Sequence, residues 1–252
     1  MLVENPRGNY SFLPAIGAFS SGAVAMPGYE VVRVVLAAPV PYRKGLAGID
    51  RFLLAQGRPP QALCGVELRS PRPMTFDEFA AFNGEYFAEL QKLDIPVEGV
   101  NPVARTNVVP ALDPPTEASL YAFSYTTPVK DSPLTFVVAG GGDRVVKGEK
   151  PESSDMIRQG DVSAEGMQEK VAFVLGLMEK RLAALGAGWP QVTAVSVYTV
   201  QNIFPLLASL LLPRLGPAKI HGVRWHFVRP PVQGMEFEMD LSGSRRLLVL
   251  DL

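Results

Sequence analysis

The chain has 252 residues, of which 47% are hydrophobic, and its 24 basic side chains are balanced by 25 acidic ones. A chain of this length and apolar content can bury one large core or two smaller ones. The balanced charge argues against a nucleic-acid partner or an anionic membrane surface, because proteins that bind these usually carry a basic excess. The composition therefore predicts a soluble, cytoplasmic protein that handles a small molecule or has a structural role.

Cysteine and histidine are too scarce for several classes of site. The single cysteine, Cys64, excludes an internal disulfide framework and a thiolate zinc cluster. The two histidines, His221 and His226, lie five positions apart, which places them on opposite faces of a strand and is not a ligand spacing. The N-terminus lacks the order of a signal peptide, and the most apolar stretch, 203–212, is too short to span a bilayer. We expect no metal, no cofactor and no membrane contact.

The first half of the chain alternates strand patterns with two helical patterns. Apolar or β-branched segments bounded by proline or glycine predict strands at 30–37, 62–68, 104–109 and 119–124. A helix is expected at 42–56, closed by Gly57. A second helix follows the capping box formed by Thr75 and Glu78. Aromatic and apolar residues recur along it at helical spacing, namely Phe79, Phe82, Tyr86, Phe87 and Leu90.

The second half repeats this order of elements. Strands are predicted at 134–139, 193–200, 220–227, 235–241 and 246–250, and helices at 163–185 and 203–215. The glycine run that ends at Gly142 is interpreted as a hairpin turn, because the residues after it do not form the helix that a phosphate loop requires. The segment 146–162 is polar and is expected to be a mobile loop.

The two halves share the order β, α, β, α, β, β and also align at the residue level. Pro60-Gln61 and Pro190-Gln191 precede corresponding strands, and residues 102–105 match 216–219. An internal repeat of this kind predicts duplicated units. We therefore expect an α+β fold of two related units, at 1–130 and 131–252, with the polar loop inside the second.

Several segments resemble the RidA/YjgF family of small α+β proteins. The family combines an F…N…Y helix, a P-A-R strand start, an early G-P-Y-S…S-G segment and a closing E-x-E strand. Similar patterns occur here at 82–86, 103–106, 17–22 and 236–238, and VVAGGG at 137–142 lies where the family has its S-G turn. The resemblance implies two tandem units like trimeric chorismate mutase, each a mixed β-sheet backed by two helices. It also implies a homotrimer in which six such units have pseudo-sixfold character.

The resemblance further implies hydrolysis of a small carboxylated enamine or imine to a ketone and ammonia. Arg105 would bind the carboxylate, and Glu236 or Glu238 would place or activate the water. Neither half holds a complete family site: the first lacks the glutamate, and the second has Lys219 in place of the arginine. Either a composite site forms between unlike units, or the activity has been lost or changed. The substrate-binding residues of a composite site would be Arg105, Asn83, Phe19, Tyr86, Gly140 and Gly141.

Other interpretations of the same residues stay open. A guanidinium is costly to bury without an anionic partner, so Arg105 could instead form a structural ion pair. Glu236 and Glu238 could continue a solvated strand face together with Asp240. The chain could also carry chorismate-type chemistry on another cyclic acid, or be a non-catalytic ligand-binding or assembly protein, because fold alone does not decide function.

Overall fold

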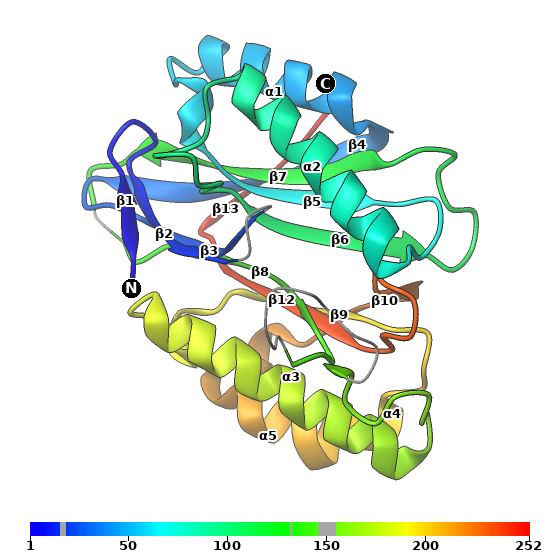
Figure 1. Cartoon of the computed structure of the whole chain (residues 1–252). Helices are drawn as coiled ribbons and strands as arrows, with labels where there is room; N and C mark the ends of the chain where they lie inside the picture. The colour runs from blue at the N-terminus through cyan, green and yellow to red at the C-terminus, as the bar shows by residue number, and fades with distance from the viewer. Residues whose placement is uncertain (16–18, 132, 146–154) are drawn as a thin grey trace.

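The computed structural model describes residues 1–15, 19–131, 133–145 and 155–252, and its strands join into one curled, mixed sheet (Figure 1). Along the chain the strands are β1 (Val3–Asn5), β2 (Tyr10–Pro14), β3 (Ser20–Ala25), β4 (Tyr29–Pro41), β5 (Leu63–Arg69), β6 (Ala104–Pro110), β7 (Ser119–Pro128), β8 (Phe136–Gly142), β9 (Ala194–Tyr198), β10 (Arg224–His226), β11 (Val228–Arg229), β12 (Glu238–Gly243) and β13 (Arg246–Leu250). Their order in the sheet is β10-β9-β12-β8-β3-β6-β5-β7-β4-β13, with β1, β2 and β11 attached beside this path.

Helices cover the sheet from two opposite sides, as Figure 1 shows. The helices are α1 (Tyr42–Ala55), α2 (Phe76–Lys92), α3 (Ala164–Ala184), α4 (Phe204–Leu206) and α5 (Leu212–Leu215). One core lies beneath α1 and α2 and is built from residues of the first half and its strands. A second core lies beneath α3 and the α4–α5 segment, against β8, β9 and β12. Two separate apolar cores therefore share one sheet.

The starts of α2 and α3 are fixed by the side chains that cap them. The Thr75 hydroxyl accepts from the Glu78 backbone N–H at 3.2 Å, and the Glu78 carboxylate accepts from the Thr75 N–H at 2.8 Å. A cap of this kind stabilises a helix by about 1 kcal/mol. Ser163 caps α3 by accepting from Gly166, and Gly186, at φ +72°, follows its last turn. The predicted helices at 42–56, 75–90 and 163–185 are all present.

Three expectations about local structure in the second half were wrong. The glycine run at 140–142 is not a hairpin turn but the end of β8. The start of the predicted strand 220–227 belongs to a 3-10 helix (Gly216–His221), so His221 is not on a strand. The predicted helix 203–215 contains a π-helical segment (Leu207–Leu211) between α4 and α5. Pro213 has no N–H to donate to the carbonyl four residues earlier, which favours such an irregularity.

The prediction of two tandem units, each with its own sheet, was also wrong. The N-terminal strand β3 pairs with β8 of the second half, and the C-terminal strand β13 runs parallel to β4 of the first. The repeated order of elements is local information, whereas strand pairing is decided over long sequence separations. Whether 1–130 and 131–252 behave as domains stays a prediction. Of the predicted loop at 146–162, residues 146–154 lie outside the described residues.

One junction between neighbouring strands of the sheet, that of β3 with β6, is short. β3 and β6 share a single pair of aligned residues, Ser20 and Ala104, whereas β5 and β6 share five. A large cavity opens beside this junction.

Among the residues that the structure describes, no helix is both long and apolar enough to cross a membrane.

Candidate active site

The cavity beside the β3–β6 junction has a volume of about 630 Å³ and lies between residues of α2 and α3. This volume is typical of small-molecule sites. Both halves of the chain supply its walls, because α2 and β6 come from the first half and β8, α3 and β12 from the second. The expectation that residues of unlike halves meet in one cleft therefore agrees with the geometry, although the cleft lies within a single chain.

Arg105 enters the cavity from β6 and is only 3% exposed. Its guanidinium lies close to four aromatic rings, with its carbon 4.8 Å from the centre of the Tyr86 ring and 5.0 Å from that of Phe19. Phe79 and Phe82 lie slightly farther away, each at 5.5 Å. Cation–π contacts of this kind favour a desolvated guanidinium. The aromatic residues of α2 therefore help to stabilise the charge of Arg105.

Asn83 provides the polar contact to Arg105. Its Oδ1 accepts a hydrogen bond from Nη2 of Arg105 at 2.5 Å, whereas Nη1 is buried and has no hydrogen-bond partner among the described residues. Burial lowers the pKa of Arg105 to about 10, so the side chain is still cationic at neutral pH. A buried cation with an unused donor that lines a cavity is suited to bind an anion.

Glu238, the first residue of β12, lines the same cavity and is 4% exposed. Burial, followed by the nearby negative charge of Asp240, raises the pKa of Glu238 to about 8, while Arg181 and Arg105 act in the opposite direction. At neutral pH its carboxyl group is therefore mostly protonated. A protonated acid with a pKa near the working pH can give up a proton and take it back.

The glycine strand at the end of β8 shapes the space around this carboxyl group. A Cβ atom on Gly140 would collide with Glu238 Oε1. On Gly141 it would come within 2.8 to 2.9 Å of Leu177, Met178 and Arg181 of α3. Both glycines line the cavity, as the sequence predicted, but their role in the structure is to permit close packing rather than to form a turn.

Arg181 of α3 is a cavity residue that sequence reasoning missed. Its Nη1 donates to the carbonyl oxygens of Ala139 and Gly140, at 2.8 and 3.1 Å. Burial lowers its pKa to about 10, and the charge of Glu238 opposes that shift. The signal in the sequence was its position, because Arg181 lies next to the buried face of α3 that includes Met178 and Leu182.

The cavity carries a strong excess of positive charge. Glu238 is the one acidic residue in its described lining, whereas the basic residues there are Arg105, Arg144, Lys180 and Arg181. The remaining lining is mostly apolar, including Phe76, Phe79 and Met235. Low-polarity walls strengthen the field of these cations. The arrangement is suited to a small anion that carries more than one negative charge.

Two predicted site residues do not line the cavity. Glu236 precedes β12, and its carboxylate accepts from Gln201 Nε2 at 2.9 Å. Its backbone N–H donates to Asp143, which forms a buried ion pair with Lys170 at 3.1 Å. Tyr86 is fully buried, and its ring contacts the guanidinium of Arg105. Phe19, Asn83, Arg105, Gly140, Gly141 and Glu238 do line the cavity.

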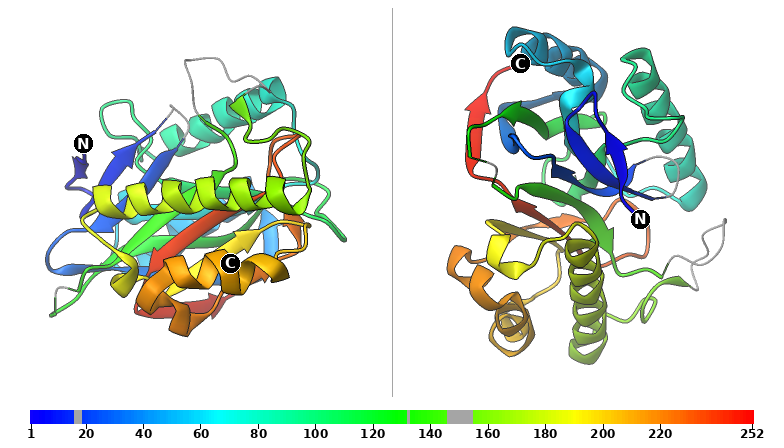
Figure 2. Two further views of the ribbon diagram at one scale, coloured as in Figure 1. Left: turned by 90° about the horizontal axis from the view of Figure 1, so that it is seen from below. Right: turned by 90° about the vertical axis from the view of Figure 1, so that its left-hand side faces the viewer.

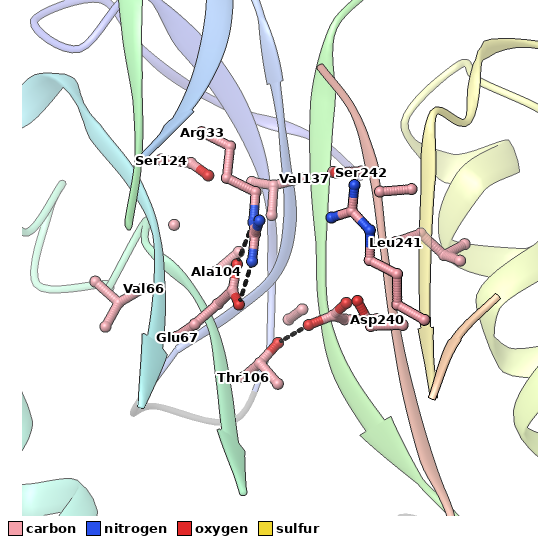
Figure 3. Close-up of a pocket in the computed structure, with 15 residues that line it drawn as sticks. Arg33, Val66, Glu67, Ala104, Thr106, Ser124, Val137, Asp240, Leu241 and Ser242 are labelled. Atoms are coloured by element: carbon pink, nitrogen blue, oxygen red, sulfur yellow. Dashed lines mark hydrogen bonds and ion pairs between the residues drawn. The ribbon is translucent and has the colours of Figure 1, made fainter. Parts of the chain in front are cut away.

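A second polar cluster lies among the strands of the curled sheet (Figure 3). Arg33 and Glu67 form an ion pair with a closest distance of 2.6 Å. Asp240 accepts from the hydroxyls of Thr106 and Tyr198, at 2.8 and 2.7 Å. The space between these groups is about 10 Å³, room for about one water molecule. This cluster therefore supports the strands around Glu238 rather than forming a ligand site.

Neither cysteine nor histidine contributes to the cavity. Cys64 is fully buried, and burial raises the pKa of its thiol. His226 stacks on Tyr198 at 5.1 Å, and burial lowers its pKa to about 4. Among the described residues, no group of three or more histidine, cysteine or acidic side chains is placed to hold a metal ion.

Comparison with known proteins assigns nearly the whole chain to one family. The family model described as 2-aminomuconate deaminase CnbZ matches residues 2–248. Over 245 residues the chain is 42% identical to 2-amino-5-chloromuconate deaminase from Comamonas testosteroni, with 96% of each chain covered.

The similarities to solved structures are much looser. A chorismatase gives a TM-score of 0.44 at 12% identity, over 93% of this chain and 81% of that one. A cyanuric acid hydrolase from A. caulinodans gives 0.40 at 13% identity, over 88% and 69%. The family match contradicts the resemblance to RidA/YjgF, which rested on short motifs of a few residues each. The predicted pseudo-sixfold homotrimer was drawn from that resemblance and is left without support.

Proposed function

Since the chain belongs to the 2-aminomuconate deaminase family, we propose that it hydrolyses 2-aminomuconate or a close analogue and releases ammonia. Deaminase activity was predicted from the sequence, and membership of this family confirms it in that coarse form. The substrate and the residues that act on it are the proposal. Its main support is one observation: the buried Arg105, with an unused donor, and the protonated Glu238 line the same cavity.

The proposed substrate fits the charge of the cavity. 2-Aminomuconate is a conjugated six-carbon diacid with its amino group next to one carboxylate, so it is both an enamine and a dianion. Arg105 would pair with one carboxylate through its free Nη1. Arg181 and Lys180 of α3 would face the other from the opposite wall. The apolar lining between these cations suits the planar carbon chain.

The first proposed step is protonation of carbon. The nitrogen lone pair of the enamine forms a C=N bond, and the electrons of the adjacent C=C bond take the proton from the carboxyl group of Glu238. This step needs Glu238 in its neutral form, and the raised pKa supplies that form at pH 7. The product is an iminium ion beside a carboxylate, a charge pair that a poorly hydrated cavity stabilises.

The second proposed step is addition of water. The carboxylate of Glu238 takes a proton from water as its oxygen bonds to the iminium carbon, which gives a carbinolamine. The carboxyl group of Glu238 then gives that proton to nitrogen, the C–N bond breaks and ammonia leaves. The hydroxyl proton returns to Glu238 as the C=O bond forms, so the acid is restored. The sum is enamine plus water giving ketone plus ammonia. Arg105 and Arg181 hold the two ends of the substrate through both steps, so the reacting carbon stays beside Glu238.

The test is ammonia release from freshly generated 2-aminomuconate, compared with 2-aminoacrylate, an enamine with a single carboxylate. The dianion is expected to react with a kcat/KM at least roughly tenfold higher, since a second charge-assisted contact contributes about 1.5–3 kcal/mol. Equal kcat/KM values for both compounds would contradict the proposal that the cavity binds two carboxylates of the substrate. Absence of ammonia from 2-aminomuconate and from its 5-chloro analogue would overturn the proposed function itself.

A further inference from the structure

β13 is an edge strand with an exposed apolar face. It ends the described strand order of the sheet and pairs only with β4, as its position at one margin in Figure 2 illustrates. Leu247 is 53% exposed and Val249 is 67% exposed. An edge strand leaves backbone N–H and C=O groups unpaired, which makes it a template for another strand. Covering the strand would also remove the exposed apolar side chains of Leu247 and Val249 from water, which is favourable.

The two faces of β13 have different surroundings. Leu248 and Leu250 pack against the core beneath α1, and Arg246 forms an ion pair with Glu30 of β4 at 2.8 Å. Because side chains alternate along a strand, the odd-numbered residues share the other face. Leu247 and Val249 lie on that face. The exposed Arg245 comes directly before the strand and the exposed Asp251 directly after it, so a positive charge flanks one end and a negative charge the other.

We propose that β13 pairs antiparallel with β13 of a second copy, centred on Leu248, and so forms a two-fold symmetric dimer. In this register Leu247 lies opposite Val249 of the second copy, and Arg245 lies opposite Asp251 of the second copy. Symmetry repeats both pairs, which gives two apolar contacts flanked by two ion pairs. Apolar and opposite-charge pairs across strands are both stabilising, and a self-complementary patch is what a two-fold interface requires.

Neighbouring registers lack this complementarity. Centred on Leu247, the pairing would place Arg245 opposite Val249, and centred on Val249 it would place Leu247 opposite Asp251. Only the register centred on Leu248 places both the apolar residues and the opposite charges across from one another. The other end of the described sheet is different, since β10 has only three residues and begins with the exposed Arg224. Short, charged edges are typical of strands that stay unpaired.

The test is the mass of the native chain in solution, with charge changes on β13. Light scattering at micromolar concentration is expected to give twice 27.3 kDa. Arg245→Asp and Asp251→Arg each place like charges opposite one another at both ends of the interface. Each is expected to raise the dimer dissociation constant roughly tenfold or more. The double variant R245D/D251R restores opposite charges and is expected to recover the dimer.

Two further measurements complete this test. Ile220→Lys changes an apolar residue that is 84% exposed elsewhere, and it is expected to leave the mass unchanged. Hydrogen exchange of the 246–250 amides in the unmodified chain is expected to slow as protein concentration rises, which requires no variant to fold. A monomer or trimer, a dimer unaffected by both single variants, or exchange in β13 that does not depend on concentration would each overturn the proposal.

Discussion

The two walls of the cavity each hold an arginine, but they do so in different ways. Arg105, on the α2 side, rests among four aromatic rings and one amide, and its Nη1 has no hydrogen-bond partner among the described residues. Arg181, on the α3 side, donates Nη1 to two backbone carbonyls of the glycine strand. Both have a pKa near 10 because of burial, so their charge state does not distinguish them.

The difference lies in what each arginine has left to offer. Aromatic rings favour a cation without using its N–H donors, so Arg105 keeps hydrogen-bonding capacity for a ligand. Arg181 uses one of its nitrogens in hydrogen bonds to β8, and these bonds connect α3 to the strand beside Glu238. We therefore expect Arg105 to be mainly a ligand-binding residue, and Arg181 both to bind and to hold that wall in place.

The largest effect is expected from Glu238→Gln, which removes the acid between the two walls. Proton transfer by a positioned side chain contributes about 10²- to 10⁴-fold, so ammonia release should fall in kcat by that range. Glu236→Gln is the matched control two residues away, outside the cavity lining, and should keep most of the activity. Similar losses in both variants would mean that β12, and not the Glu238 carboxyl, is what was damaged.

The next largest effect is expected from the two arginines, and it separates the walls. Arg105→Lys keeps the charge but loses the planar fork, so kcat/KM for the dianion should fall roughly 10- to 100-fold with an unchanged melting temperature. Arg181→Lys also loses the bonds to Ala139 and Gly140, so it should lower both kcat/KM and the melting temperature. If the two variants behave alike in thermal melts, the division of roles is wrong.

A smaller effect is expected from the glycine strand. Gly140→Ala places a methyl group against the Glu238 carboxyl, and such overpacking costs about 1–3 kcal/mol in the free energy of unfolding. Gly84→Ala is the control, because a Cβ there meets nothing within 4 Å and α2 should gain up to about 1 kcal/mol. Denaturant unfolding measures both, and a neutral Gly140→Ala would contradict the close packing of β8 against Glu238.

The smallest effect concerns stability and needs no substrate. The pKa of Glu238 is raised from 4.5 to about 8 on folding, so the unfolded chain loses this proton first as the pH rises. The folded state is therefore penalised progressively between pH 4.5 and 8, and fully above pH 8. Glu238→Gln lacks that penalty and should melt at a higher temperature than the unmodified chain at pH 9, with the difference shrinking towards pH 4. A constant difference would contradict the raised pKa.

The sequence predicted elements better than it predicted their assembly. Capping and periodicity located α1, α2 and α3, because those signals lie within one or two helical turns. The pairing of β13 with β4 and of β3 with β8 depends on contacts between distant residues, which no local pattern encodes. The tandem interpretation failed for that reason, and the RidA/YjgF resemblance failed with it.

The candidate site was predicted in part, and for identifiable reasons. Arg105 stood out because a guanidinium in an apolar strand is costly to bury, and Glu238 because of the E-x-E pattern at 236–238. The structure places both in one cavity. Glu236 has the same residue type but precedes β12, so its side chain meets Gln201 instead. Arg181 escaped notice because a basic residue near the end of a helix is ordinary, although it lies next to the buried residue Leu182.

The central claim is that Glu238 acts as the proton donor of the cavity, and the pH dependence of kcat/KM for ammonia release tests it most directly. The raised pKa predicts that kcat/KM falls as the pH rises through about 8, because the proton donor ionises there. At lower pH this group should no longer limit kcat/KM. The residual activity of Glu238→Gln should lack that fall. The same descending limb in both proteins would contradict the claim and assign the ionisation to another group.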